Sequence, residues 1–304
     1  KTKGEETMKK TLAIMLALIM VLAMVPALAE DADGQSSGNP ATYTIPARVK
    51  RIEDYAFAGD TSLERVKIPD GVTEIGDYAF SGCTNLQEIV LPDGLTKIGA
   101  HAFDGCTALV RLGDMNQLES IGEYAFSGCE ALESIGDMPK LQTIGNYAFA
   151  ELTVTDEATG AVTTVSCHAL KHVGNLNSLT TIGERAFFKC RSLASIGSLS
   201  NVRTIGDTAF VYCRSLASVG DLRNVTSIGD HAFAGCSSLE SIGDMPNLTS
   251  LGDGAFANII VLENGKEAGT AACASLKQIG DMLYDSIDAG KMQINRGHCR
   301  TKRQ

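Results

Sequence analysis

The chain has little positive charge for its length. Its 304 residues carry 26 Lys and Arg against 36 Asp and Glu, which gives a formal net charge of −10 at pH 7. Because nucleic acids attract clustered basic side chains, this balance argues against nucleic acid as a partner. Residues 291–304 do hold five Lys and Arg and no acidic residue. A basic run this short is typical of a solvated tail, and a wall- or phosphate-binding role is the alternative.

The sequence also lacks the short motifs that mark common catalytic sites. It contains no G-x-S-x-G, no H-E-x-x-H and no G-x-x-x-x-G-K, and no His stands in a fixed relation to a plausible nucleophile. We therefore expect no enzymatic activity, no catalytic residue and no cofactor. An enzyme would require residues that only folding brings together.

Long apolar runs are missing after Ala29. Residues 8–10 read MKK, the run from Leu12 to Val25 is apolar and uncharged, and Pro26 precedes a small-x-small cleavage pattern. These features predict a signal peptide over residues 1–29, with residues 1–7 as a leading extension. An uncleaved membrane anchor is the alternative. We expect an extracellular protein, secreted or cell-surface associated, with no membrane insertion after cleavage.

A nine-residue phrase recurs along the rest of the chain, as IGDYAFSGC at 75–83 and IGAHAFDGC at 98–106. Nine of the ten phenylalanines occupy one position of it, and they recur with a 23-residue period that a single 38-residue step interrupts. An Ile or Leu stands five residues before each Phe, and a Leu follows in every repeat. The repeated phenylalanines are Phe57, Phe80, Phe103, Phe126, Phe149, Phe187, Phe210, Phe233 and Phe256.

The apolar residues of each repeat fall in two short segments separated by Gly and Asp, which favours brief strands joined by tight turns. One repeat is too short to bury its own apolar face, so neighbouring repeats must stack. We predict a β-rich solenoid of about nine 23-residue rungs over residues 42–282. Residues 42–49 would form a half rung that closes the front, residues 30–41 a linker, and residues 283–304 a C-terminal tail.

The repeated IGxxAFxGCxxL phrase resembles the 23-residue leucine-rich repeat of the BspA-like family of bacterial surface proteins. The resemblance spans about residues 42–282 and implies a leucine-rich repeat stack. It also implies a protein that binds proteins or cells outside the bacterium, with host matrix proteins among the partners of some members. It names no particular ligand.

Eight cysteines belong to the repeats, and a ninth, Cys299, lies in the basic tail. In an exported protein such a number would suggest disulfides. Equivalent residues of adjacent rungs are about 4.8 Å apart, however, and their side chains point in the same direction instead of converging. We therefore expect buried thiols in the core. Cys299 is a candidate reactive or intermolecular thiol.

Acidic residues recur after the repeated Gly residues, for example Asp77 and Asp114, and raise the question of calcium. Each turn offers one carboxylate, whereas calcium loops gather several oxygen ligands, so turn-forming aspartate is the better interpretation and we expect no calcium site. Cys167, His168 and His172 have metal-ligand residue types. Because Cys167 already occupies the repeat position, we expect no metal site there.

The residues that precede the Ala-Phe pairs form a column whose first five members are aromatic. Amphipathic, semi-rigid rings are good anchors in protein interfaces, so we name these five as candidate partner-binding residues. The alternative is that the rings pack on one another and support the turn. The five are Tyr55, Tyr78, His101, Tyr124 and Tyr147.

Two repeats are interrupted at the same place, between Phe and Cys, by residues 152–166 and 259–272. Both inserts place β-forming residues around a turn-rich centre, which predicts two β-hairpins. They would leave the same edge of the stack, four rungs or roughly 19 Å apart, as paired prongs that contribute to partner binding. Tolerated decoration is the alternative. Their candidate contact residues are Asp156, Glu157, Asn264 and Lys266.

The sequence thus favours a non-enzymatic, secreted or cell-surface protein that binds a protein or cell-surface ligand through its repeats. A structural envelope component without a discrete ligand is one alternative. A glycan-binding or enzymatic protein, with a site that folding assembles, is the other.

Overall fold

The computed structural model describes most of the repeat region. Within the described part the chain forms strands and turns, and no helix there is long and apolar enough to cross a membrane. The predicted signal peptide, the linker and the C-terminal tail lie outside the described residues. The described residues are 42–155, 162–256, 259–263, 266–271 and 278–279.

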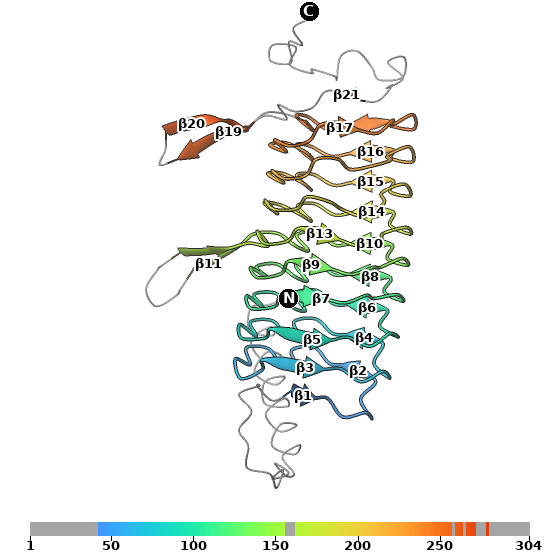
Figure 1. The fold of residues 1–304 in the computed structure, drawn as a ribbon, viewed down its shortest axis with the longest axis vertical. Coiled ribbons are helices and arrows are strands. Elements are labelled where there is room, and N and C mark those ends of the chain that lie inside the picture. Colours follow the sequence, from blue (N-terminus) through green and yellow to red (C-terminus); the bar gives the residue numbers. More distant parts are fainter. Residues whose placement is uncertain (1–41, 156–161, 257–258, 264–265, 272–277, 280–304) are drawn as a thin grey trace, which may run out of the picture.

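The repeats stack into a column of rungs, as predicted, and Figure 1 shows the rungs rising in chain order from β1 to β17. Two parallel sheets run along the column, one of six strands and one of nine. Each strand pairs with the equivalent strand of the next rung, so that Ile52 lies opposite Ile75 and Ile144 opposite Ile182. The second pair spans the 38-residue step, which shows that the insert adds no rung.

The strands are short because Gly and Asp interrupt every apolar segment. The six-stranded sheet contains β1 (Thr42–Thr44), β3 (Arg65–Lys67), β5 (Glu88–Val90), β7 (Arg111–Leu112), β9 (Ser134–Ile135) and β13 (His172–Val173). The nine-stranded sheet contains β2 (Arg51–Ile52), β4 (Glu74–Ile75), β6 (Lys97–Ile98), β8 (Ser120–Ile121), β10 (Thr143–Ile144), β14 (Thr181–Ile182), β15 (Thr204–Ile205), β16 (Ser227–Ile228) and β18 (Ser250–Leu251). A further parallel pair joins β17 (Ser241–Ile242) to β21 (Gln278–Ile279).

Two antiparallel hairpins confirm the predicted β-structure of the inserts. β11 (Leu152–Thr155) pairs with β12 (Val162–Val165), and β19 (Ile259–Glu263) pairs with β20 (Lys266–Ala271). Figure 1 shows β11 and the β19–β20 pair extending from the same side of the column. The predicted half rung is also confirmed, since β1 pairs only with β3 among the described strands and forms the first edge of its sheet.

Apolar columns fill the interior of the stack. Seven of the repeated phenylalanines are fully buried, and neighbouring rings in the column are stacked with centroids 5.0–5.5 Å apart. The Ile, Leu and Cys positions of the repeat form parallel buried columns beside them. Among the described residues, Val90 is the one large apolar side chain classed as exposed. The outer surface is therefore built from polar side chains and turns.

Candidate partner-binding surface

The described cysteines are interior side chains, as expected. Cys83 and the six that follow are free thiols and fully buried, and each Sγ donates to the carbonyl oxygen of a Phe in the preceding rung, at 3.0–3.3 Å. A small, weak donor fits this position because it fills space and also satisfies a buried carbonyl. Cys299 and the last repeat cysteine, Cys273, lie outside the described residues.

Burial raises the pKa of the six thiols from Cys83 to Cys213, to about 12 for Cys83 and Cys167. Unfolded thiols ionise near pH 8.5. The folded protein therefore holds these thiol protons more tightly than the unfolded chain does. The resulting contribution to the free energy of unfolding is fully present below about pH 8.5 and is lost as the pH rises toward 12. We therefore expect the cysteine column to be unreactive in native protein and to weaken the fold in alkali.

A thiol titration checks this prediction in a variant that carries Cys273→Ser and Cys299→Ser, so that only described cysteines remain. An aromatic disulfide reagent at pH 8 should detect no thiol in the native variant and all seven after unfolding. Rapid reaction of several thiols in the native variant would contradict the buried assignment, and so would their absence after unfolding.

Aspartates that follow the repeated Gly residues form hydrogen bonds between adjacent rungs. The Oδ1 atom of Asp77 accepts the backbone N–H of Ala100 at 2.8 Å, and Oδ1 of Asp207 accepts that of Asp230 at 2.8 Å. Each carboxylate thus accepts a hydrogen bond from a backbone N–H 23 residues ahead, in the next rung. The sequence context predicts turn formers here and does not predict this bond between rungs. No cluster of three His, Cys, Asp or Glu side chains suited to a metal ion occurs among the described residues.

The suspected metal trio points to three separate partners. The Cys167 thiol donates to the Phe126 carbonyl, Nδ1 of His168 lies 3.0 Å from the carbonyl oxygen of Ser166, and Nδ1 of His172 lies 2.8 Å from Oγ of Ser195. The side chain of Cys167 is buried and that of His172 is exposed. The structure does not bring the three together.

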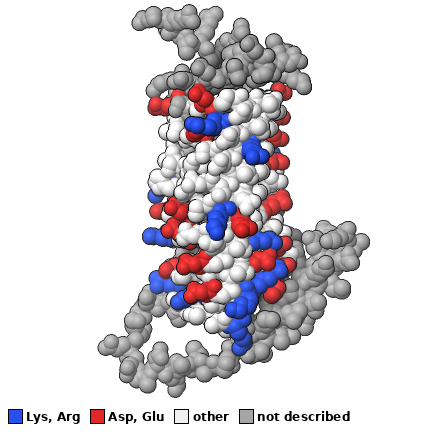
Figure 2. All heavy atoms as spheres, turned by 90° about the vertical axis from the view of Figure 1, so that its right-hand side faces the viewer, with Lys and Arg blue, Asp and Glu red and all other residues white. Residues whose placement is uncertain are grey.

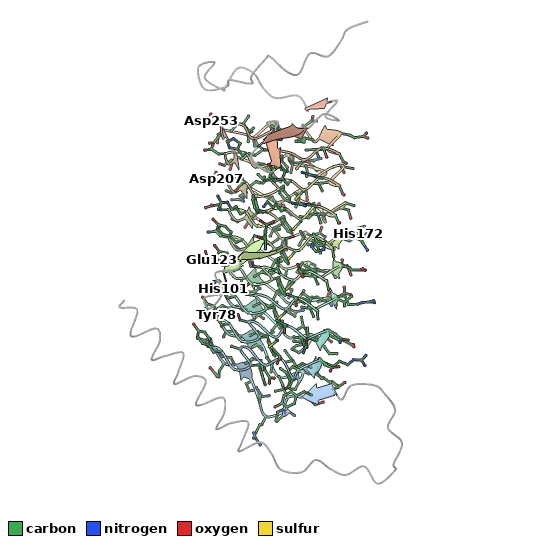
Figure 3. All side chains as sticks on the ribbon, turned by 90° about the vertical axis from the view of Figure 1, so that its left-hand side faces the viewer. Tyr78, His101, Glu123, His172, Asp207 and Asp253 are labelled. Carbon is green, nitrogen blue, oxygen red and sulfur yellow. The ribbon has the colours of Figure 1, made fainter. Side chains whose placement is uncertain are left out.

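The five aromatic residues form one continuous stack along the column. Their ring centroids are 4.4–4.7 Å apart and their planes lie within 12° of parallel. Figure 3 shows two of them, Tyr78 and His101, at one margin of the side that the hairpins leave. Arg185 continues the series in the next rung: its guanidinium lies 5.3 Å from the ring centroid of Tyr147 and donates to the Tyr147 hydroxyl at 2.8 Å.

The backbone at this column is unusual for aromatic residues. All eight non-glycine members, from Tyr55 to His231, have a left-handed φ between 51° and 61°, and the ninth member is Gly254. A left-handed residue with a bulky side chain costs roughly 1–2 kcal/mol, whereas a stacked aromatic pair contributes about 0.5–1.5 kcal/mol beyond burial. Each inner ring has two such neighbours, so stacking offsets the backbone strain. The alternative interpretation, that the rings pack on one another, is therefore correct for the ring faces.

The edges of the stacked rings still face outward, since all five side chains are only partly buried. Burial, the neighbouring Tyr147 and the Glu123 carboxylate raise the pKa of Tyr124, so its hydroxyl stays protonated. The His101 ring is held by Oδ2 of Asp104 at 2.8 Å. The stack therefore presents fixed polar edges, with their ring faces already occupied by one another.

The hairpin candidates are largely outside what the structure describes. Asp156, Glu157 and Asn264 lie outside the described residues. Lys266 is the first residue of β20, where its backbone is registered with Glu263.

The outer face of the nine-stranded sheet changes from charged to hydroxyl side chains along the stack. In the nine-stranded sheet Glu74 lies between Arg51 and Lys97, at 3.5 and 2.8 Å, and the hydrogen bond from Lys97 lowers the pKa of the Glu74 carboxyl. The same outward position in all later rungs carries a hydroxyl. These residues are Ser120, Thr143, Thr181, Thr204, Ser227 and Ser250.

A polar groove that sequence reasoning missed lies on the turns that precede the strands of the nine-stranded sheet from β10 to β18. Its volume is about 680 Å³, within the range of ligand sites. Figure 2 views this edge and shows charged side chains over its N-terminal half but a mainly uncharged surface over its C-terminal half. The recurrence of Asn201, Asn224 and Asn247 at one position of the 23-residue period is the signal that could have found it. The groove is lined by Gln142, Asn177, Ser178, Thr180, Asn201, Arg203, Asn224, Thr226 and Asn247.

The family model of the BspA-type leucine-rich repeat region matches residues 36–156 and 163–286, with six copies. No curated protein matches the chain. Among solved structures, the chain is similar to the T. pallidum leucine-rich repeat protein TpLRR, with 30% identity, 58% of this chain and 77% of that chain covered, and a TM-score of 0.49.

Two further solved structures are similar in sequence. A leucine-rich repeat protein from Bacteroides ovatus is 25% identical, with 78% of each chain covered and a TM-score of 0.30. A leucine-rich cell surface protein from Faecalibacterium prausnitzii is 21% identical, with 81% of this chain and 90% of that chain covered and a TM-score of 0.32.

Proposed function

The chain belongs to the BspA-type leucine-rich repeat family, and from that premise we propose that it is an extracellular binding protein whose solenoid holds a protein partner. The observation that carries the proposal is the aromatic stack from Tyr55 to Tyr147, continued by Arg185. Tyr and Arg dominate the energetic centres of protein interfaces.

Preorganisation supports this role for the stack. An interface side chain that becomes immobilised costs about 0.5–1.5 kcal/mol, and that cost is largely removed where the free protein already holds the side chain. The rings here are fixed by their neighbours above and below, at centroid spacings of 4.4–4.7 Å. A partner would meet a rigid row of hydroxyl and imidazole edges. The partner classes we propose are host matrix proteins and other cell-surface proteins.

The first hairpin is the second part of the proposed surface. β11 and β12 pair with each other, and no other described strand pairs with either, so each has one edge that no described strand occupies. Such edges accept an additional strand from a partner. Figure 3 views the side of the molecule that carries both the hairpin and the aromatic margin. We place the partner across this side.

A capture experiment tests the aromatic stack. The chain without residues 1–29 is immobilised and exposed to matrix proteins, mucins and cell-wall fragments, and the affinity of a captured protein is measured. Because a central interface residue contributes about 2 kcal/mol or more, Tyr124→Ala should weaken binding roughly 30-fold. His231→Ala is the matched control, since His231 has the same left-handed backbone, with φ 54°, outside the ring stack.

Equal affinity of the Tyr124→Ala and wild-type proteins would remove the stack from the interface. Capture of no protein from the panel, with folding verified by the unfolding transition, would count against the proposed function itself. Removal of residues 152–166 in the same assay measures the hairpin's contribution. That deletion restores the 23-residue step between rungs and should leave the fold intact.

A further inference from the structure

The polar groove on the turns before β10 to β18 has a composition that sets it apart from the proposed protein-binding side. All nine lining residues are polar, four of them are Asn, and Arg203 is the only charged one. It is built from the turns of successive rungs and so runs along the stack. Figure 2 shows that the surface around it carries few charged side chains. A ligand for this groove must therefore be polar, largely uncharged and extended.

The amide groups in the groove are held in fixed orientations. Nδ2 of Asn224 donates to the carbonyl oxygen of Ser200 at 2.7 Å, and Nδ2 of Asn247 donates to that of Arg223 at 2.7 Å. Asn201 makes the same bond to the carbonyl of the preceding rung. A carboxamide has two N–H donors and an oxygen acceptor. With one N–H committed to the backbone, each exposed amide offers its oxygen and its second N–H at a set position.

Threonine hydroxyls are arranged in the same way. Oγ1 of Thr180 donates to the carbonyl of Gln142 at 3.0 Å, and Oγ1 of Thr226 donates to that of Arg203 at 3.1 Å. The hydroxyl proton is thereby used, and the lone pairs of the oxygen become the available acceptors. The groove consequently presents donors and acceptors in a row, once per rung.

The rung spacing discriminates between extended ligands. Equivalent groups recur at about the strand spacing of 4.8 Å, whereas an extended peptide advances about 3.3 Å per residue and loses register with such a row. One sugar unit of an extended β-1,4-linked glycan advances by nearly the rung spacing, and because successive units are turned over, equivalent hydroxyls return at every second rung. Sugar hydroxyls both donate and accept hydrogen bonds, which matches amide and hydroxyl groups that offer both. A polyanionic ligand would find little opposite charge here, because Arg203 is the one charged lining residue and Arg223 beside the groove already pairs with Asp221.

We propose that this groove is a binding site for a neutral, extended β-linked polysaccharide, with one sugar unit held per rung between Gln142 and Asn247. The asparagines and threonines contact the sugar hydroxyls, and Arg203 donates from the wall of the groove. The site is separate from the aromatic stack, so it would add a glycan contact to a protein-binding molecule. Binding depends on hydrogen bonds and little on charge.

Titration calorimetry of the chain without residues 1–29 tests the site, with cellohexaose and chitohexaose as neutral β-linked probes and maltohexaose as the curved, α-linked control. We expect at least one β-linked hexasaccharide to bind, maltohexaose to bind at least tenfold more weakly, and raised salt to leave the affinity unchanged. Asn224→Ala and Arg203→Ala should each weaken binding about tenfold, the effect of losing one or two hydrogen bonds.

Asn85→Ala is the matched control, because Nδ2 of Asn85 makes the same kind of bond, 2.8 Å to the Thr61 carbonyl, away from the groove. It should leave hexasaccharide affinity unchanged. The proposal is overturned if neither β-linked hexasaccharide binds, or if Asn85→Ala weakens binding as much as Asn224→Ala. Tyr124→Ala should retain sugar binding, so failure of this site and failure of the protein-binding proposal are distinguishable.

Discussion

Replacing Phe126 by alanine is expected to lower the free energy of unfolding by about 3–5 kcal/mol. The side chain is fully buried, and its ring stacks between those of Phe103 and Phe149 with centroids 5.2 and 5.3 Å away. Truncation removes both stacking contacts and leaves a cavity that rungs on either side cannot close, because backbone hydrogen bonds fix their separation. The midpoint of urea unfolding measures the loss.

Phe57→Ala is the control for position in the stack. Phe57 is only partly buried and lies at the front of the phenylalanine column, where its one stacked phenylalanine neighbour is Phe80. Its truncation should cost clearly less than that of Phe126. An unchanged unfolding midpoint for Phe126→Ala would refute the assignment of this column as the centre of the core.

Replacing Gly122 by alanine is expected to destabilise the protein by about 3 kcal/mol or more, although only one methyl group is added. A Cβ at this position would lie 2.5 Å from the backbone nitrogen of Ala100 and from the carbonyl carbon of Gly99 in the preceding rung. Those atoms are backbone and hydrogen-bonded, so the two rungs would have to separate. The glycine is thus required by the spacing between rungs.

Gly113→Ala supplies the matched comparison, because no atom lies within 4 Å of the Cβ it would add. We expect its effect to stay within about 0.5 kcal/mol, as for ordinary surface substitutions. The two variants add the same methyl group to neighbouring rungs, and their unfolding midpoints can be compared directly. Similar unfolding midpoints for the two variants would show that the close contact between rungs is not the reason why Gly122 must be a glycine.

The sequence by itself determined the stacked fold and the contents of its core. A strict 23-residue period leaves one way to bury the repeated Phe, Ile, Leu and Cys, namely to place each type in its own column. The inserts could also be predicted as hairpins, because β-forming residues on either side of a turn pair with each other locally. The buried thiols followed from the geometry of equivalent positions, and the described cysteines agree.

Only the tertiary structure decided what the repeated polar residues do. The local sequence predicts that Asp77 is a turn residue, yet its carboxylate accepts a hydrogen bond from a backbone N–H 23 residues away. For Tyr124 the sequence left open an interface anchor or a ring packed on its neighbours, and the structure shows a left-handed backbone and a ring stacked between those of both adjacent rungs. The sequence assigns no role to Asn224, which in the structure lines a groove together with Asn201 and Asn247.

The physical reason for this division is the length scale of the interactions. Burial of an apolar side chain depends on its period along the chain, which can be read directly from the residues. A capping bond, a ring stack, a close glycine contact and a groove depend on atoms of adjacent rungs that lie within a few ångströms of one another. The sequence separates those atoms by a whole repeat, and only the stack brings them together.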